Sequence, residues 1–267
     1  MAGSRLADSD LRRAHLNLID SSRQFFELDS GARIDDAAGW LFGAGTASHP
    51  VISNAAFRRD DDLDAAELIE RAQRFFSPLS RGFSVWVRTE QEEDRDLTAA
   101  AEEAGLKTVY GMPEMVLRER LEPVSPPPDV ELSQLREPGH APDFWRVAKA
   151  AYATNGFPPE VFAGYTRHEG LLAENVAAFV AYLAGEPVSI AMTIVSQGVA
   201  GIYWVGSVEA ARGKGLGRTV TVAATNAGFD LGADIAALQA SPMGEPIYLS
   251  LGYETAFEYQ LMISPAP

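Results

Sequence analysis

A run of glycine and basic residues at 212–218 is the part of the sequence most directly suited to chemistry. It reads Arg-Gly-Lys-Gly-Leu-Gly-Arg, with Gly213, Gly215 and Gly217 at alternate positions. Glycine adopts backbone angles that other residues resist, so successive amides can turn toward one point and bind an anion. A helix-compatible run, 219–227, follows, and a helix starting there adds unpaired N–H groups and a positive dipole end. The pattern predicts a phosphate or pyrophosphate site.

The spacing excludes two common phosphate-binding motifs. A Walker loop requires Lys and then Ser or Thr after its last glycine, but Gly215 is followed by Leu216. A dinucleotide-binding turn has the spacing Gly-x-Gly-x-x-Gly, whereas this run has Gly-x-Gly-x-Gly. A nucleotide-binding enzyme is therefore a weak alternative. A glycine-rich turn with solvated basic side chains also stays open.

Composition restricts the classes of function. The chain of 267 residues has a formal net charge of −15, which argues against nucleic acid as a partner and permits a cationic, amine-bearing one. A merely solvated acidic surface is the alternative. With no cysteine, thiol nucleophiles, disulfides and Cys-ligated metals are excluded, and a reducing, cytoplasmic location fits. Neither a signal peptide nor a membrane-spanning run is expected.

The first half of the chain alternates helical and extended patterns. An apolar stripe that includes His15 predicts a helix over 8–28, with Asp8 or Ser9 as its cap and the histidine packed at the surface. The remaining expectations are strands at 40–42, 51–52, 83–87 and 107–117 and helices over 64–76 and 94–104, the last ended by Gly105.

A proline-rich segment, 123–128, predicts a stiff linker between two domains, 1–122 and 129–267. The second half suggests helices at 141–152 and 159–168, and strands at 176–183 and 188–195. An apolar run, 201–208, leads into the glycine loop, and 254–263 alternates as a half-buried strand. These elements indicate an α/β fold with a mixed sheet and flanking helices.

The second half resembles the GNAT superfamily of acyl-CoA N-acyltransferases. Its pyrophosphate loop, Arg/Gln-x-x-Gly-x-Gly/Ala, is matched by Arg212, Gly215 and Gly217. The family also carries a later strand, here 234–240, and a short tyrosine-bearing helix that ends in Leu-Gly-Phe/Tyr, here Pro246-Ile-Tyr-Leu-Ser-Leu-Gly-Tyr253. Both signals occur in the family's order and spacing. The resemblance covers residues 129–267 well and the first half faintly.

The two halves share one order of elements, which predicts a tandem duplication. Helix 64–76, strand 83–87, helix 94–104 and strand 107–117 run parallel to helix 218–230, strand 234–240, helix 243–251 and strand 254–263. Where the first copy would hold its phosphate loop, an aspartate run at 60–62 would repel pyrophosphate. The resemblance thus implies two tandem GNAT-like domains, of which the first is degenerate.

The resemblance also implies a set of site residues for acetyl-CoA. Backbone groups of Ser207 and Val208, with Val205 or Gly206, would contact the pantetheine arm, and Tyr248 stands where the family often places the general acid that protonates the leaving thiolate. Ser241 takes the place of a frequent asparagine, which leaves its role in doubt. The pyrophosphate would meet residues 212–218, for which the expected contacts are Arg212, Gly213, Lys214, Gly215, Leu216, Gly217 and Arg218.

A base for the acceptor amine is missing from the expected place. The strand 202–208 holds no Asp or Glu, and His168, Glu169 and Glu174 read as surface residues. Aromatic residues of this half, Trp145, Phe157, Phe162, Tyr165 and Trp204, could shape an acceptor pocket or be core. The resemblance implies an N-acetyltransferase that needs no metal and acts, as monomer or homodimer, on an amine-bearing small molecule or peptide. A non-catalytic CoA-binding regulator or scaffold is the alternative.

Overall fold

The computed structural model describes residues 7–89 and 91–266. Its helices are α1 (Asp8–Leu28), α2 (Ala65–Phe76), α3 (Arg95–Glu103), α4 (Ala141–Ala153), α5 (Leu216–Asp230) and α6 (Glu245–Ser250). Its strands are β1 (Arg33–Asp36), β2 (Trp40–Ala44), β3 (Asn54–Arg58), β4 (Phe83–Arg88), β5 (Lys107–Leu117), β6 (Val130–Gln134), β7 (Val176–Leu183), β8 (Glu186–Ser196), β9 (Val199–Ser207), β10 (Ile235–Gln239) and β11 (Glu254–Ser264). The expected mixed α/β fold is confirmed.

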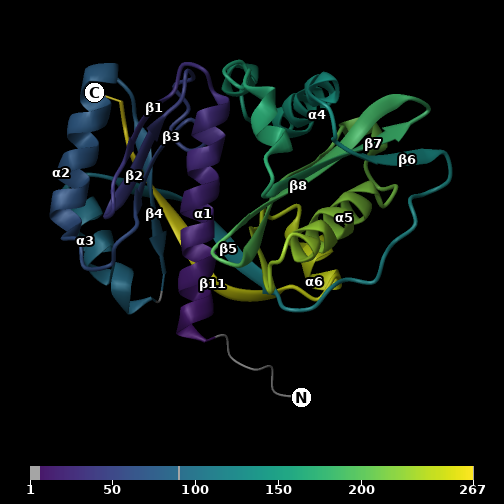
Figure 1. Ribbon diagram of the computed structural model, residues 1–267. Helices are drawn as coiled ribbons and strands as arrows, with labels where there is room; N and C mark the ends of the chain where they lie inside the picture. The colour runs from purple at the N-terminus through teal and green to yellow at the C-terminus, as the bar shows by residue number, and fades with distance from the viewer. Residues whose placement is uncertain (1–6, 90, 267) are drawn as a thin grey trace.

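One twisted sheet runs through the molecule (Figure 1). Within the described residues its strand order is β1-β2-β3-β4-β11-β5-β10-β9-β8-β7-β6. Neighbours are antiparallel except at two places, β3 with β4 and β9 with β10. Each parallel pair is joined by a crossover helix, α2 in the first half and α5 in the second, as parallel strands require.

The tandem order of elements is present in three dimensions. The unit β3-α2-β4-α3-β5 of the first half has the order of β9-α5-β10-α6-β11 in the second. In both units the first two strands are parallel and the last strand is antiparallel to its neighbours. The helix after the first strand covers the sheet in both units: α2 is amphipathic and packs its apolar face on it, whereas α5 buries apolar and threonine side chains on several sides.

The last strand of each half is inserted beside the other half. β11 lies between β4 and β5, whereas β5 lies between β11 and β10. In Figure 1 the yellow β11 crosses to the first half, so that the chain ends near α2. The proline-rich segment 123–128 contains neither helix nor strand and connects β5 to β6. Since the sheet is continuous across the halves, the division at this segment stays a prediction.

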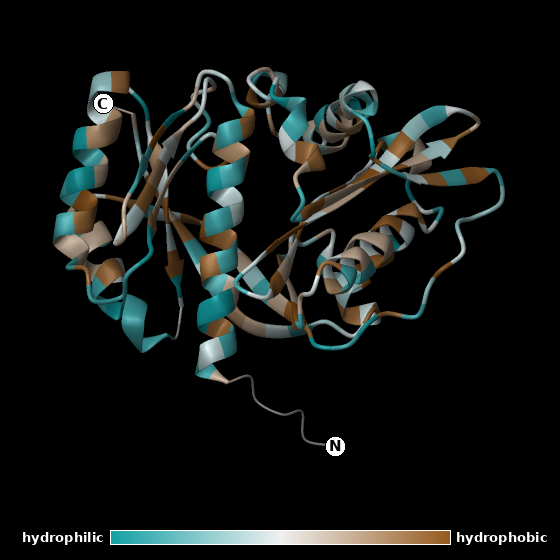
Figure 2. Cartoon of the chain, viewed as in Figure 1, coloured by the Kyte–Doolittle hydropathy of each residue, from teal (hydrophilic) through white to brown (hydrophobic). Residues whose placement is uncertain are grey.

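Helices cover both faces of the sheet. α1 and α4 share one apolar cluster, built around Ile19 and Phe144, and the opposite face carries α2 and α3 in the first half and α5 and α6 in the second. β4 shows the alternation: Trp86 packs toward α1, whereas Val85 and Val87 pack toward α2. In Figure 2 hydrophobic residues follow the central strands, and α1 and α2 alternate in character along their length.

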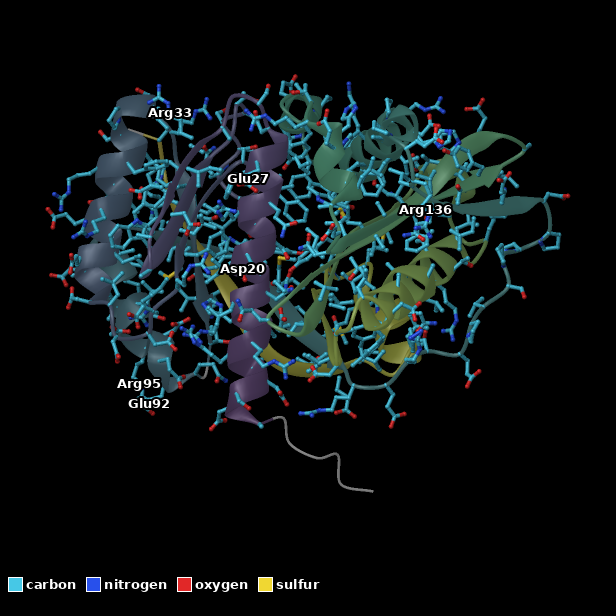
Figure 3. The ribbon with its side chains drawn as sticks, viewed as in Figure 1. Asp20, Glu27, Arg33, Glu92, Arg95 and Arg136 are labelled. Carbon is cyan, nitrogen blue, oxygen red and sulfur yellow. The ribbon has the colours of Figure 1, made fainter. Side chains whose placement is uncertain are left out.

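α1 stands between the halves and bonds to both (Figure 1). The Nδ2 of Asn17 donates to the carbonyls of Ile194 (3.1 Å) and Val199 (2.9 Å) in the second half. Asp20, labelled in Figure 3, accepts from Arg59 of the first half at 2.7 Å and from Gln197 of the second at 2.9 Å. The helix therefore connects the two halves of the sheet through side-chain hydrogen bonds.

Four local expectations were wrong. The N-cap of α1 is Ala7 and no side chain caps the helix, so neither Asp8 nor Ser9 is the cap. The residues 51–52 form a turn, because the His49 ring accepts the N–H groups of both at 3.3 Å, and the strand starts at Asn54. The expected helix 159–168 is not continuous: Pro159–Phe162 forms a 3-10 turn and His168 begins another, because the backbone between them bonds to the end of α1. His15 is 1% exposed rather than at the surface; it bonds the Tyr259 hydroxyl at 2.9 Å.

The first half carries an ion-pair network where the second half carries its glycine loop. β3 and β4 pair only at Ala55–Ala56, and beyond that point the guanidinium groups of Arg58 and Arg88, 1% and 4% exposed, fill the space. Arg88 donates to Asp94 at 2.7 and 2.9 Å. Burial raises the pKa of Asp94, but Arg88 outweighs it and holds that pKa well below its usual value. The network occupies the position of a phosphate site.

No helix within residues 7–89 and 91–266 is both long and apolar enough to cross a membrane.

The buried network predicts a large stability loss on removal of its carboxylate. Asp94→Ala leaves two buried guanidinium groups without this partner, so we expect the free energy of unfolding to fall by about 3–5 kcal/mol in urea denaturation. Asp96→Ala is the matched control, because Asp96 also pairs with Arg58 but its side chain is 57% exposed; its cost should stay below about 1 kcal/mol. Equal losses in both variants would contradict this account.

Candidate active site

The glycine loop connects β9 to α5 and is shaped by two left-handed residues. Gly213 has φ 74° and Gly215 has φ 78°, and a Cβ at either would meet nothing within 4 Å. Backbone angle rather than crowding therefore requires glycine at both positions. Gly217 differs from them, since its φ is not positive and a Cβ there would make an ordinary contact with the Ile247 Cδ1 of α6 at 3.4 Å.

The N-terminus of α5 is open. Its N-cap is Gly215, and no side chain caps the helix. The first backbone bond into the helix is that of the Thr219 N–H to the Gly215 carbonyl, at 3.1 Å. The N–H groups of Leu216, Gly217 and Arg218 precede it, so they have no partner within the helix and point out of its positive end. This arrangement suits an anion.

The basic side chains of the loop have different surroundings. The Arg212 guanidinium turns toward α4, where it donates to the Ala151 carbonyl at 3.3 Å and to the Thr154 hydroxyl. Arg218 reaches α6 and donates to the Ser250 hydroxyl at 3.1 Å. Lys214 is exposed. Arg212 thus positions the end of α4, and backbone amides are left as the groups nearest an anion in the loop.

The strand before the loop separates from its parallel neighbour. β9 and β10 pair only where Val199–Gly201 meets Ile235–Ala237. Further along β9, Trp204 has φ 53° and the register with β8 shifts, which marks a bulge. The edge of β9 after Trp204 therefore faces away from β10, and the Val205 carbonyl accepts from the Tyr152 hydroxyl at 3.4 Å. An extended ligand could lie along this edge.

A pocket of about 440 Å³ joins the glycine loop to the split strands. Of the predicted residues it is lined by Val205, Gly206, Ser207, Arg212, Gly213, Gly215, Leu216, Gly217, Arg218, Ser241 and Tyr248. Two predicted residues, Val208 and Lys214, do not line it. The N–H of Val208 already donates to the Val188 carbonyl at 2.9 Å.

Tyr248 lies in the pocket wall on α6 and is 7% exposed. A Cβ at Gly244 would lie 2.9 Å from its ring, so this glycine makes room for it. Burial raises the pKa of the Tyr248 hydroxyl, which keeps it protonated at neutral pH and also makes it a weaker acid than a solvated phenol. Ser241 starts this segment: its Oγ accepts the Gly244 N–H at 3.2 Å.

Further residues complete the pocket without having been predicted for the site; they lie at and just after the end of α4, after β9, and on or just before α6. They are Ala151, Tyr152, Asn155, Ala211, Met243, Gly244, Ile247 and Ser250. The five aromatic residues suggested for an acceptor pocket do not line this one. Trp145, Phe162 and Tyr165 are core, at 7–8% exposure, and Trp204 packs against them. Among the residues that were missed, Tyr152 could have been found from the sequence, because it lies seven residues after Trp145 and so on the same stripe of α4.

The pocket wall within the described residues contains no carboxylate. Glu169 and Glu174 are exposed, and His168 lies outside the lining. Across the residues that the structure describes, no group of three or more His, Cys, Asp or Glu is arranged to hold a metal ion. The charges at hand are therefore the helix N-terminus and the arginines.

No protein-family model matches the sequence, and no curated protein matches it. Solved structures do, over nearly the whole chain. A GCN5-related N-acetyltransferase from Kribbella flavida has a TM-score of 0.71 at 20% identity, covering 97% of this chain and 96% of that one. One from Sphaerobacter thermophilus has a TM-score of 0.62 at 12% identity, covering 98% and 95%.

A tandem GNAT protein from the clavulanic acid biosynthesis pathway has a TM-score of 0.60 at 12% identity, covering 93% of this chain and 95% of that one. Similarity at such identities concerns the fold. It confirms the resemblance drawn from the sequence. The chain has the GCN5-related N-acetyltransferase fold, arranged in tandem.

Proposed function

We propose that the protein is an N-acyltransferase that moves an acetyl group from acetyl-CoA to an amine. The observation that carries this proposal is one pocket that joins an uncapped helix N-terminus to the edge of a split strand and to Tyr248. A long ligand with a pyrophosphate, an amide-bearing arm and a thioester end matches these three parts in order. The fold, shared with N-acetyltransferases, supports the same reaction class.

Each part of the pocket takes a defined role. The amides of residues 213–218 bind the pyrophosphate. The β9 edge at Val205–Ser207 pairs with the pantetheine amides, and a backbone N–H of this strand stabilises the thioester oxyanion. The acceptor nitrogen attacks the carbonyl carbon, the carbon–sulfur bond breaks, and the Tyr248 hydroxyl gives its proton to the leaving thiolate.

A second hollow favours CoA over a shorter ligand. It has a volume of about 640 Å³, and Arg218 and Ser250 line it as well as the first pocket. Its wall carries Arg118 and Arg120, which are about half exposed and pair with Asp10 and Asp230. Three glutamates also line it: Glu119, Glu122 and Glu254. The adenosine end of CoA, with its additional phosphate, would extend in this direction.

A CoA-binding regulator without activity is the second candidate, because the described pocket wall holds no carboxylate. Turnover decides between the two. Purified protein incubated with acetyl-CoA and a panel of primary amines, including polyamines and peptides, should release free thiol in the presence of at least one amine. Acetyl-CoA binding without thiol release from any amine would favour the regulator. The acceptor, the cytoplasmic location and the monomeric or dimeric state stay predictions.

Gly215→Val should abolish acetyl-CoA binding. Valine is strained at φ 78°, so the amides of the loop would lose their common direction. Gly185→Val is the matched control, since Gly185 has φ 82°, equally open surroundings and a place outside the pocket. Thermal shift with acetyl-CoA measures both. If acetyl-CoA stabilises Gly215→Val as much as it stabilises the control, the loop does not bind the ligand.

Tyr248→Phe should lower kcat by about 10²-fold, because only the proton donor is lost, and should leave the affinity for acetyl-CoA unchanged. Tyr253→Phe is the control: Tyr253 is equally buried nearby, but its hydroxyl bonds Thr225 at 2.7 Å and does not line the pocket. Thiol release under saturating substrate gives the rates. If both variants keep the wild-type rate, Tyr248 has no part in proton transfer.

A further inference from the structure

A buried glutamate of the first half accepts a hydrogen bond from Gln239 of β10, two residues before Ser241 of the candidate site. Glu114 is on β5, directly opposite Gln239 of β10 and Phe257 of β11. Residues paired across antiparallel strands point to the same face of a sheet. Phe257 belongs to the cluster under α1 and α4, so Glu114 points to that face, the one from which α4 contributes Tyr152 to the pocket.

The carboxyl group of Glu114 is only partly satisfied. It is 0% exposed, and its Oε2 accepts from the Gln239 Nε2 at 2.7 Å. No donor among residues 7–89 and 91–266 meets its Oε1, which is also buried. A buried carboxyl oxygen without a donor is costly and uncommon, so it calls for an explanation. Burial raises the pKa of Glu114 to about 8, against the bond from Gln239.

The position of Glu114 relates to the split between β9 and β10. The two strands stop pairing after Ala237, and Gln239 lies beyond that point, where β10 no longer meets β9. Across the split stands Tyr203, whose pKa is raised by burial and then further by the charge of Glu114. The glutamate is therefore one hydrogen bond away from the residue that borders the split.

We propose that Glu114, delivered by the exchanged strand of the first half, is the proton acceptor for the amine substrate at the second half's site. This inference rests on the proposed acyl transfer. The pocket wall offers no described carboxylate for this role, and Glu114 does not line that wall either, so the acceptor nitrogen would have to reach it from the face of the sheet under α1 and α4. This role also explains the unpaired oxygen, because an ammonium N–H is the donor that Oε1 lacks.

The proton balance of the reaction closes with this residue. The acceptor ammonium gives one proton to the Glu114 carboxylate, and the free amine then bonds to the thioester carbon. As the carbon–sulfur bond breaks, the thiolate takes the Tyr248 proton, and the new amide nitrogen releases its extra proton to the Tyr248 phenolate. Glu114 returns its proton to water, so one proton is released for each amide formed.

Glu114 is the group in its surroundings that titrates near neutral pH. The facing titratable and charged groups are His15 and Asp20 of α1, Tyr203 of β9, Tyr259 of β11, and the Arg88–Asp94 pair. Burial lowers the pKa of His15 to about 3, so His15 stays neutral. Burial and the charge of Glu114 raise the pKa of Tyr259, so it stays protonated.

The test compares the pH profile of wild-type kcat/KM with that of Glu114→Gln, an isostere that can still accept from Gln239. In the wild type the rate should rise about tenfold per pH unit below about pH 8, where the carboxylate forms. Glu114→Gln should lose about 10²- to 10⁴-fold in kcat/KM and the midpoint near pH 8, because its residual rate then follows deprotonation of the amine in solution, with acetyl-CoA affinity unchanged. Glu258→Gln, on the exposed face of β11, should match the wild type.

A second variant keeps the proposal falsifiable if Glu114→Gln does not fold. Gln239→Ala removes the bond that lowers the pKa of Glu114, so the midpoint of the rate profile should move to higher pH. An unmoved midpoint, or a wild-type profile in Glu114→Gln, would overturn the role of Glu114 while leaving acyl transfer intact. If the wild type transfers to no amine, the proposed function itself fails, and the role falls with it.

Discussion

The pairing of β11 with β5 at the centre of the sheet is the constraint on which the rest of the structure depends. Each strand also pairs with the opposite half, β11 with β4 and β5 with β10, so the backbone groups of either half are satisfied only when the other is in place. Tyr259, Leu261 and Met262 of β11 are all buried in this arrangement. The two halves are therefore expected to fold as one unit.

The exchange also divides labour between the copies. In the first half, the place of a phosphate loop is filled by Arg58, Arg88 and Asp94, and the two arginines also pair with Asp96 and Asp61, so neither cation is left for an anion. That half instead supplies structure: α1 ties both halves, and β5 forms a wall of the second half's sheet. In the second half the N-terminus of α5 has no side-chain cap, and β9 and β10 separate after three paired residues.

Much of the second half could be predicted from sequence because its signals are local. Glycines at alternate positions, a helix after them and Tyr248 on a short helix before Gly252 depend on near neighbours, and the structure brings most of the predicted residues into one pocket. The amphipathic α2 and the alternating β11 could also be predicted from their residue patterns. The pairing between distant strands could not. The last strands of both halves have similar patterns, so nothing in either specifies which half it joins.

Side-chain direction was a second limit. Arg212 matches a loop motif, yet its guanidinium serves the end of α4, because the carbonyl of Ala151 lies within reach only in the folded chain. Glu114 within a strand reads as a residue of the solvent face, and its burial depends on β10 and β11, which come more than a hundred residues later. The bulge at Trp204 has no sequence signal, because tryptophan rarely adopts positive φ.

Calorimetric titration of the full chain with acetyl-CoA, with ATP and NAD as controls, tests the central claim most directly. The claim is that the loop amides, the β9 edge and the wall around Tyr248 form one cofactor site. The account predicts saturable 1:1 binding of acetyl-CoA that neither ATP nor NAD reproduces. An absence of heat with acetyl-CoA, CoA and longer acyl-CoAs, under conditions where the protein is folded, would mean that the glycine loop is only a turn, and the proposed function would fall with it.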